Sequence, residues 1–246
     1  MIMKTEVLLL GTRHNLSKLT DLKLHIGSDV ISPSKAVRNI GAMFDSSLTM
    51  SNHIAVTCKG AWHQLRLISQ IRPYLDAEAT KILMHAFVTS RLDNFNSLLY
   101  GIPKKEIKRL QRIQNAAARI ITKTKSSCHI TTILQQLHWL PVVQRIDYKI
   151  CLLTFKSLHG LAPKYITGLI HKVESSAMSH RSHRSEEKNL LIVPSSRLVT
   201  FGDRSFSVAA PKLWNNLPAD CRAITKLSTF KSQLKTWLFK QAFMDV

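Results

Sequence analysis

Acidic residues are scarce in this sequence of 246 residues, which has 15 Asp and Glu against 35 Lys and Arg and a formal net charge of +20. An excess of this size favours a polyanionic partner, either a nucleic acid or an anionic membrane surface. The acids are also scattered, and the only adjacent pair is Glu186-Glu187. Because two-metal phosphoryl transfer needs several carboxylates that converge on the ions, the sequence predicts no complete catalytic site of that kind.

Cysteines are few, and long apolar runs are missing. Cys58, Cys128, Cys151 and Cys221 lie far apart without a C-x-x-C pair, which favours small inert thiols over a disulfide framework or a zinc site. No apolar run approaches the roughly 18 residues of a membrane span. The first residues also lack the basic segment and apolar core of a signal peptide. We therefore expect an intracellular protein of the nucleus or cytoplasm, not a secreted one.

The motifs of several enzyme classes are absent too. The sequence has no glycine-rich phosphate loop, no H-E-x-x-H and no G-x-S-x-G. His171, His180 and His183 lie in a polar segment without cysteine, so we expect solvated histidines there and no metal site. The chain on its own is expected to have no enzyme activity and no cofactor.

A change of hydrophobic pattern divides the chain. Over residues 5–45, short apolar or alternating runs such as Val7–Leu10, Leu22–Ile26 and Ala36–Phe44 predict strands. After Thr49 the period becomes helical. The residues expected on the buried face of the first long helix are Ile54, Cys58, Ala61, Leu65 and Ile68. The sequence thus predicts an α+β chain that is mostly helical, with a small antiparallel β part first.

Helix boundaries follow from prolines, glycines and caps. Pro73 ends the first helix, and Asp76 is a good N-cap for the next. Further helices are expected over 76–92, 103–125, 130–137, 141–158, 163–171, 205–217 and 228–243, and a strand over 190–193. Composition divides the chain into a β part (1–48), a helical region (49–171), a flexible polar linker (172–189) and a C-terminal αβ segment (190–246).

The helix after Pro103 has the clearest functional pattern. At about 100° per residue, one stripe roughly 80° wide holds only basic residues apart from Ala116. The residues of this basic stripe are Lys105, Arg109, Arg112, Arg119 and Lys123. A solvated surface helix usually intersperses acids at i+4, whereas Glu106 is the only acid here. We therefore expect this face to bind backbone phosphates, without base reading or sequence specificity.

Two shorter stripes of basic residues add to this expectation. Lys59, His63 and Arg66 share one face of their helix, and Arg145, Lys149 and Lys156 form a narrow polar strip on an otherwise apolar helix. Each could be a solvated edge, but with the long helix they predict a positive groove. The tryptophans Trp62, Trp139, Trp214 and Trp237 all fall in apolar patterns, so we expect them to pack in the core.

Several stretches of the chain together carry a family resemblance. In this order, the sequence contains KTEVLLLG, VRNIGAMFDSSLTM, HAFVTSRLDNFNSLLYGIPKK, LQRIQNAAARIIT, HITTILQQLHWLPVVQRIDYKI, FKSLHGLAPKYI and FGDRSFSVAAPKLWNNLP. Together they resemble the C-terminal part of the reverse transcriptases (RNA-directed DNA polymerases) of non-LTR, LINE-type retrotransposons. The resemblance covers nearly the whole chain.

The resemblance implies roles for particular regions. Lys4 stands where the family's palm has a lysine thought to help protonate the departing pyrophosphate. The segment Asn39 to Asp45, including Ile40 and Gly41, matches the primer-grip hairpin. The helices after it correspond to the thumb and a downstream helical region, which hold the template–primer duplex. The implied partners are RNA or an RNA–DNA duplex.

The family's catalytic aspartates lie upstream of the stretch that matches KTEV, and this chain begins after them. The resemblance therefore implies a truncated, non-catalytic fragment without the N-terminal palm and fingers of the parent enzyme. Mg²⁺ is expected only for an intact parent polymerase. Two alternatives stay open: the chain is part of an active reverse transcriptase, or it is a domesticated helical module that binds a protein partner or an anionic membrane.

Overall fold

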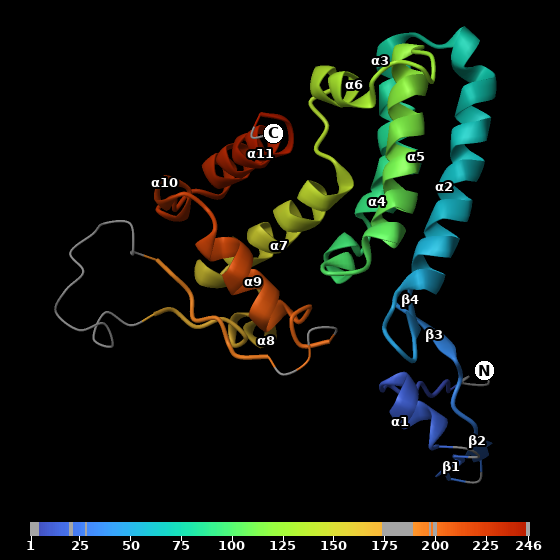
Figure 1. Cartoon of the computed structure of the whole chain (residues 1–246), viewed down its shortest axis with the longest axis vertical. Helices are drawn as coiled ribbons and strands as arrows, with labels where there is room; N and C mark the ends of the chain where they lie inside the picture. The colour runs from blue at the N-terminus through green and yellow to red at the C-terminus, as the bar shows by residue number, and fades with distance from the viewer. Residues whose placement is uncertain are drawn as a thin grey trace, which may run out of the picture.

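A computed structural model describes residues 5–19, 22–27, 29–173, 189–196, 198 and 201–244. Among the described residues, helices make up 58% and strands 8%. The chain is therefore mostly helical, as predicted, with a small antiparallel β part near its N-terminus. Figure 1 shows two groups of helices, and the N-terminal strands extend from the base of the first group. Lys4 and most of the predicted linker, including His180, His183, Glu186 and Glu187, lie outside the described residues.

Two short hairpins form the β part, next to the short helix α1 (Arg13–Ser17). Strands β1 (Leu24–Ile26) and β2 (Asp29–Ile31) pair in one, and β3 (Ala36–Asn39) and β4 (Ala42–Asp45) in the other. The prediction of a strand over Val7–Leu10 is wrong, because only Leu8 forms a bridge, to Ser34. The backbone N–H and C=O groups of a strand need hydrogen-bond partners along its whole length. Among the described residues, a neighbouring segment forms a bridge with this stretch at Leu8 alone.

The first helical group surrounds two long helices, α2 and α5, that run side by side (Figure 1). Its elements are α2 (Ser51–Ile71), the 3-10 turn η1 (Arg72–Tyr74), α3 (Ala77–Met84), the π-helix η2 (His85–Thr89), α4 (Ser90–Asp93), the 3-10 turn η3 (Asn96–Leu99), α5 (Lys104–Thr122) and α6 (Ile130–Gln136). All five apolar residues predicted for the inner face of α2 are buried. The period of the pattern and the fold therefore agree over this helix.

Helix starts follow the predicted caps, while some ends and interiors differ. The Asp76 carboxylate accepts a hydrogen bond from the Ala79 amide over 2.6 Å and caps α3 as expected. The single helix expected to Leu92 is instead interrupted by the π-helix η2. α5 ends at Thr122 and not at Lys125, because Lys123 adopts a left-handed conformation with φ 53°.

The second helical group is built around α7, which packs on α5, α9 and α11. Its elements are α7 (Val142–Leu158), α8 (Lys164–Thr167), α9 (Phe206–Asn215), α10 (Ala219–Arg222) and α11 (Leu227–Phe243). Phe230 of α11 stacks on Phe155 of α7 with ring centroids 4.3 Å apart, and Trp214 of α9 lies 5.7 Å from Phe230. α7 thus shares one aromatic core with two helices from the C-terminal part of the chain.

The strand predicted over Leu190–Val193 is also wrong, since Leu191 makes only an isolated bridge to Lys172. The Asn215 side chain explains why a sheet is not needed there. Its Oδ1 accepts from the Leu191 amide over 2.9 Å, and its Nδ2 donates to the Leu191 carbonyl over 2.8 Å. A side-chain amide therefore satisfies the two backbone groups that a neighbouring strand would pair.

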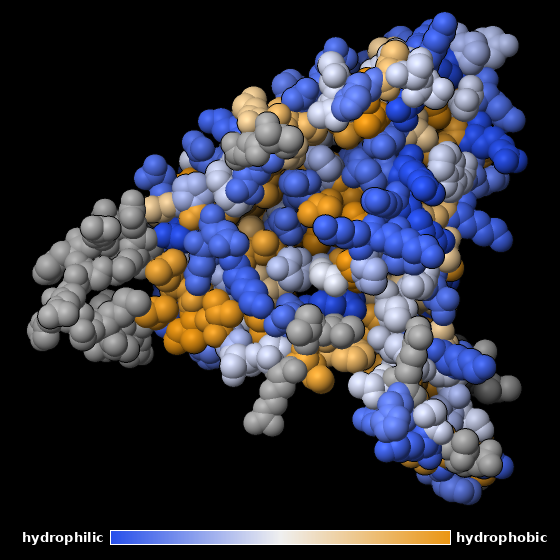
Figure 2. All heavy atoms as spheres, viewed as in Figure 1, coloured by the Kyte–Doolittle hydropathy of each residue, from blue (hydrophilic) through white to orange (hydrophobic). Residues whose placement is uncertain are grey.

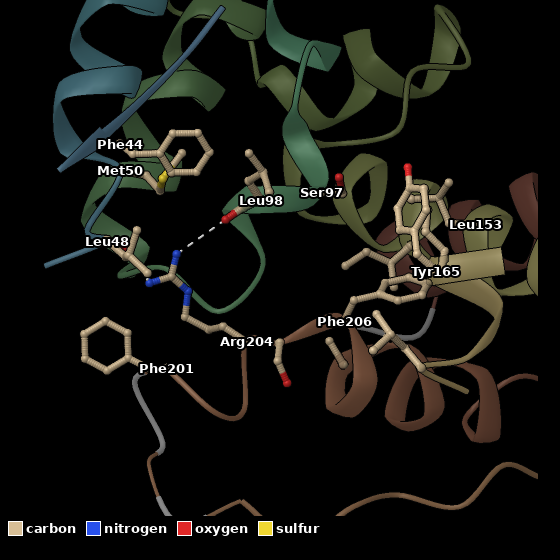
Figure 3. Close-up of a pocket in the computed structure, with 15 residues that line it drawn as sticks. Phe44, Leu48, Met50, Ser97, Leu98, Leu153, Tyr165, Phe201, Arg204 and Phe206 are labelled. Atoms are coloured by element: carbon tan, nitrogen blue, oxygen red, sulfur yellow. Dashed lines mark hydrogen bonds between the residues drawn. The ribbon is translucent and has the colours of Figure 1, made fainter. Parts of the chain in front are cut away.

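Arg204 ties the C-terminal region to the junction between β4 and α2. Its guanidinium donates to the carbonyl oxygens of Leu48 at 2.9 Å, Tyr100 at 3.1 Å and Leu98 at 3.4 Å. Figure 3 shows this side chain at the edge of a mainly apolar cavity of about 400 Å³ between the two helical groups. One arginine thus joins segments that lie more than a hundred residues apart in the sequence.

Candidate nucleic-acid interface

The basic stripe of α5 lies opposite the face that packs in the core. Leu110, Ile113 and Ala117 are buried, whereas Lys105 and Arg112 are exposed. Lys123, at the C-cap, is exposed as well. The helix is therefore amphipathic in the predicted sense, with cations on the free side. None of these three cations has an acidic partner among the described residues.

Two members of the stripe make internal contacts that the sequence did not reveal. Arg109 pairs with Glu106 over 2.7 Å, and its side chain keeps 36% exposure. Arg119 donates from one guanidinium nitrogen to the carbonyl oxygens of Ser126 (3.5 Å) and Cys128 (3.4 Å), and so holds the loop that follows α5. Phosphate binding through Arg119 would compete with these contacts, so its main role here is structural.

A groove of about 650 Å³ lies between α2 and α5, and it contains the second predicted basic stripe. Its α2 side is formed by Lys59, Trp62, His63, Leu65, Arg66 and Ser69, and its α5 side by Ile120. Lys59, His63 and Arg66 are all exposed. The structure thus places this stripe beside α5, as the prediction of a positive groove requires.

Trp62 corrects one prediction, because it is 48% exposed instead of packed in the core. At about 100° per residue it stands roughly 80° from the buried stripe of α2, at the boundary with the basic face. Trp139 and Trp214 are buried as expected, and Trp237 packs partly buried against the core. An exposed indole beside cations offers a flat surface on which a nucleic-acid base can stack.

The two long helices run in the same direction (Figure 1), and contacts relate them near both of their ends. Near the start of α5, Arg109 and Glu106 influence Cys58 of α2: burial raises the pKa of this thiol, Arg109 lowers it and Glu106 raises it. Near the end, Arg72 after α2 binds the Ile120 carbonyl. Arg109 and Ile120 are eleven residues apart, about three turns, and therefore lie on one face of α5.

The third predicted stripe does not join this groove. Arg145 forms an ion pair with Asp93, donating from Nε to Oδ1 over 2.8 Å. Arg145 and Lys149 both line a different cavity, which shares no lining residue with the α2–α5 groove. Lys156 is partly exposed two turns further along α7. The strip on α7 is thus separate from the α5 stripe.

The residues matched to the primer grip form the β3–β4 hairpin. Asn39 pairs with Ala42, and the two-residue turn Ile40-Gly41 has positive φ angles of 49° and 96°, as in a type I′ hairpin. Ile40 is 87% exposed at the tip. Asp45 accepts hydrogen bonds from the amides of Thr49 (3.0 Å) and Met50 (2.8 Å), so this residue fixes the entry into α2.

The thiols and histidines give no metal site among the described residues. All four cysteines are free; Cys58, Cys151 and Cys221 are buried and Cys128 is exposed. Burial raises the pKa of Cys221 to about 11, against a smaller lowering by Arg222. His171 is exposed. In the part of the chain that the structure describes, no helix has the length and apolar content of a membrane span.

Hydropathy separates two kinds of surface outside the groove. Figure 2 shows hydrophilic side chains along the α2 edge and a cluster of apolar ones near α8. In and next to α8 in the sequence, Leu161, Tyr165 and Leu169 are exposed. Comparisons of the chain with protein-family models, with curated proteins and with solved structures find no match.

Proposed function

We propose that the α2–α5 face binds the sugar–phosphate backbone of RNA or of an RNA–DNA duplex without reading its sequence. The observation that carries the proposal is the groove in which Lys59, His63 and Arg66 surround the half-exposed Trp62. The exposed cations of the basic stripe lie on the neighbouring helix α5, whose Ile120 lines the groove. Cations bind phosphates through charge, and an exposed indole accepts any base by stacking, so the combination favours affinity without specificity.

The composition and the family resemblance support the same proposal. A net charge of +20 raises affinity for any polyanion. The resemblance to the C-terminal part of LINE-type reverse transcriptases assigns the corresponding helices to duplex holding. On this proposal the chain serves as a thumb-like grip and takes no part in the chemistry of copying.

The test is a salt titration of binding to a fluorescently labelled RNA–DNA hybrid of mixed sequence, followed by anisotropy. We expect log K to fall linearly with log salt between about 50 and 300 mM, with a slope of about 0.9 per phosphate contacted. Changing Lys59, Arg66 and Arg112 together to Gln should reduce the slope by about 2 to 3. A second hybrid of scrambled sequence should bind equally well.

A matched control uses three cations of the same kind elsewhere. Lys226, Lys231 and Lys240 are exposed on or beside α11 and lie outside the groove. Changing these three to Gln removes the same charge and should leave the slope almost unchanged. Equal loss in both triple variants would show a diffuse charge effect and contradict the proposed face, as would absence of binding at the lowest salt.

A protein partner is a second candidate, favoured by the exposed apolar residues of the β part. Leu10, Leu19, Ile26, Val30 and Ile40 are all more than 45% exposed. Exposed apolar side chains that form a patch are typical of a protein contact. The palm and fingers of a parent polymerase would fit this role, and so would an unrelated partner of a domesticated module. Tight, salt-insensitive association with a protein would favour this function over nucleic-acid binding.

A further inference from the structure

Another cavity, of about 560 Å³, lies between α3, η2, α7 and α11. It is lined by Lys81, His85, Asp93, Asn96, Leu137, His138, Trp139, Leu140, Arg145, Tyr148, Lys149, Leu152 and Lys235. This volume falls in the range of small-ligand pockets, about 300–1,000 Å³. We call it the α3–α7–α11 cavity.

The charge in this cavity is strongly positive. Lys149 and Lys235, from α7 and α11, have no acidic partner among the described residues. Lys81 makes only a 3.7 Å contact with the exposed Glu78. The Asp93 carboxylate forms an ion pair with Arg145 and does not neutralise the lysines. Three helices thus contribute lysines to the lining of one cavity, and such a concentration of cations favours a phosphate group.

One wall of the cavity is apolar and aromatic. Leu137, Leu140 and Leu152 line it together with Trp139 and Tyr148. The His85 ring lies 5.5 Å from the Trp139 ring. Burial lowers the pKa of His85, and Arg145 and Lys81 lower it further, against a smaller raising by Asp93 and Glu78, so the charged form of this imidazole is disfavoured. The wall therefore suits the uncharged, planar part of a ligand.

A buried acceptor completes the cavity. Asn96 is 4% exposed, and its Nδ2 donates to Asp93 Oδ1 (3.5 Å) and to the Arg145 carbonyl (3.4 Å). Both neighbours are acceptors, which fixes the amide orientation and leaves Oδ1 without a donor among the described residues. An unpaired buried acceptor costs free energy, and a ligand hydroxyl or amino group would relieve that cost.

We propose that the α3–α7–α11 cavity binds a small phosphorylated ligand of the nucleoside phosphate class. Such a ligand supplies the anion for Lys149 and Lys235, a planar ring for the Trp139 side and hydrogen-bond donors for Asn96. The π-helix η2 supports the assignment, because such segments are rare and are frequent at functional sites. The site is separate from the proposed nucleic-acid groove, so either can fail without the other.

The test is isothermal titration calorimetry of the whole chain with ATP, inorganic triphosphate and adenosine as separate probes. We expect ATP to bind, triphosphate to bind more weakly and adenosine to bind weakest. The variant Lys149→Gln with Lys235→Gln should lose at least about tenfold in affinity for ATP. The control Lys226→Gln with Lys231→Gln removes the same charge outside the cavity and should keep the affinity.

The variant Asn96→Leu tests the contacts of the nucleoside end of the ligand independently of those of its phosphate end. It should weaken ATP several-fold and leave triphosphate unchanged, provided that circular dichroism shows an intact fold; if this variant does not fold, the lysine pair decides the test. No binding of ATP at about 1 mM, or the same affinity in the cavity and control variants, would overturn the proposal. Competition with RNA gives a further outcome against the proposal. If RNA abolishes ATP binding only in the chain whose α2–α5 groove is intact, ATP occupies that groove and not the α3–α7–α11 cavity.

Discussion

Arg72 donates a hydrogen bond from Nε to the carbonyl oxygen of Ile120 over 2.9 Å, and Nη2 of the same side chain reaches the Ile121 carbonyl at 3.0 Å. These carbonyls belong to the last turn of α5, where no helical amide remains to pair them. A third bond, from Nη1 to the Leu75 carbonyl, fixes the turn after α2. One buried guanidinium thus closes both long helices at the same end.

Arg72→Met should therefore lower the free energy of unfolding by about 3 kcal/mol, since it leaves these carbonyls unpaired. Urea denaturation followed by circular dichroism measures the change. Arg66→Met, on the exposed face of α2, should change it by less than about 0.5 kcal/mol. Equal effects of the two substitutions would contradict the role of Arg72 as a shared cap.

Gly101 stands against Arg204 in a left-handed conformation with φ 67°, and a Cβ there would lie 2.7 Å from Arg204 Cγ. Gly101→Ala should cost about 1 kcal/mol for the backbone and about 1–2 kcal/mol more for displacing the arginine. Gly160 has φ 68° with nothing within 4 Å of a built Cβ. Gly160→Ala should thus show the backbone cost alone, and identical losses in thermal unfolding would argue against the Arg204 contact.

Asp147 is a partly buried carboxyl of α7, and burial raises its pKa from 3.8 to about 6. The folded state thus binds more protons than the unfolded state between these values, so the free energy of unfolding falls as pH rises through this window. Asp147→Asn should stabilise the protein by about 2 kcal/mol or less at pH 7.5, and by roughly half as much at pH 5. Urea titrations at both pH values measure it, with the exposed Asp29→Asn as control. A gain that does not change with pH would count against this origin.

Arg112 and Arg119 belong to the same predicted stripe but differ in their contacts. On the proposed function, Arg112→Gln should reduce the salt slope of hybrid binding by about 0.9 with little change in stability. Arg119→Gln should instead lower the stability by about 1 kcal/mol, because the loop after α5 loses its donor. Anisotropy and urea denaturation on both variants separate the two roles. The reverse pattern would place Arg119, and not Arg112, at the phosphate.

The helices could be predicted because their signals are local. The buried face of α2 follows from apolar spacing, and the α3 start follows from the Asp76 cap. The basic stripe of α5 could be predicted for the same reason, because it follows from residue spacing within one helix. The sequence did not show which cations of the stripe are free of contacts within the protein. Arg119, for example, donates hydrogen bonds to carbonyl oxygens of the following loop.

Long-range pairing explains what could not be predicted. Leu191 reads as part of a strand, but its backbone is paired by the Asn215 side chain, which lies 24 residues away. The α3–α7–α11 cavity collects Lys81, Lys149 and Lys235 from three helices, and no spacing in the sequence relates them. These features arise from packing between elements and not from the pattern within one element.

The β part allows a prediction about truncation. Residues before 35 expose several large apolar side chains, including Ile26 and Val30, which favours aggregation of the isolated chain. Residues 36–48 differ, because the Asp45 carboxylate caps the entry to α2 and the Leu48 carbonyl accepts from Arg204. A chain that starts at residue 35 should therefore be more soluble than the whole chain, with nearly the same unfolding temperature.

A chain that starts at residue 49 loses the cap and the Arg204 acceptor as well. It should unfold at a temperature lower by several degrees, since about 1–2 kcal/mol of hydrogen bonding is removed from a helix start that the rest of the fold needs. Soluble yield and thermal unfolding of the three chains measure both effects. If the chain from residue 49 is the most stable of the three, the β3–β4 hairpin does not support α2. If removal of residues 1–34 lowers solubility, these apolar side chains cover one another and leave no surface for a partner.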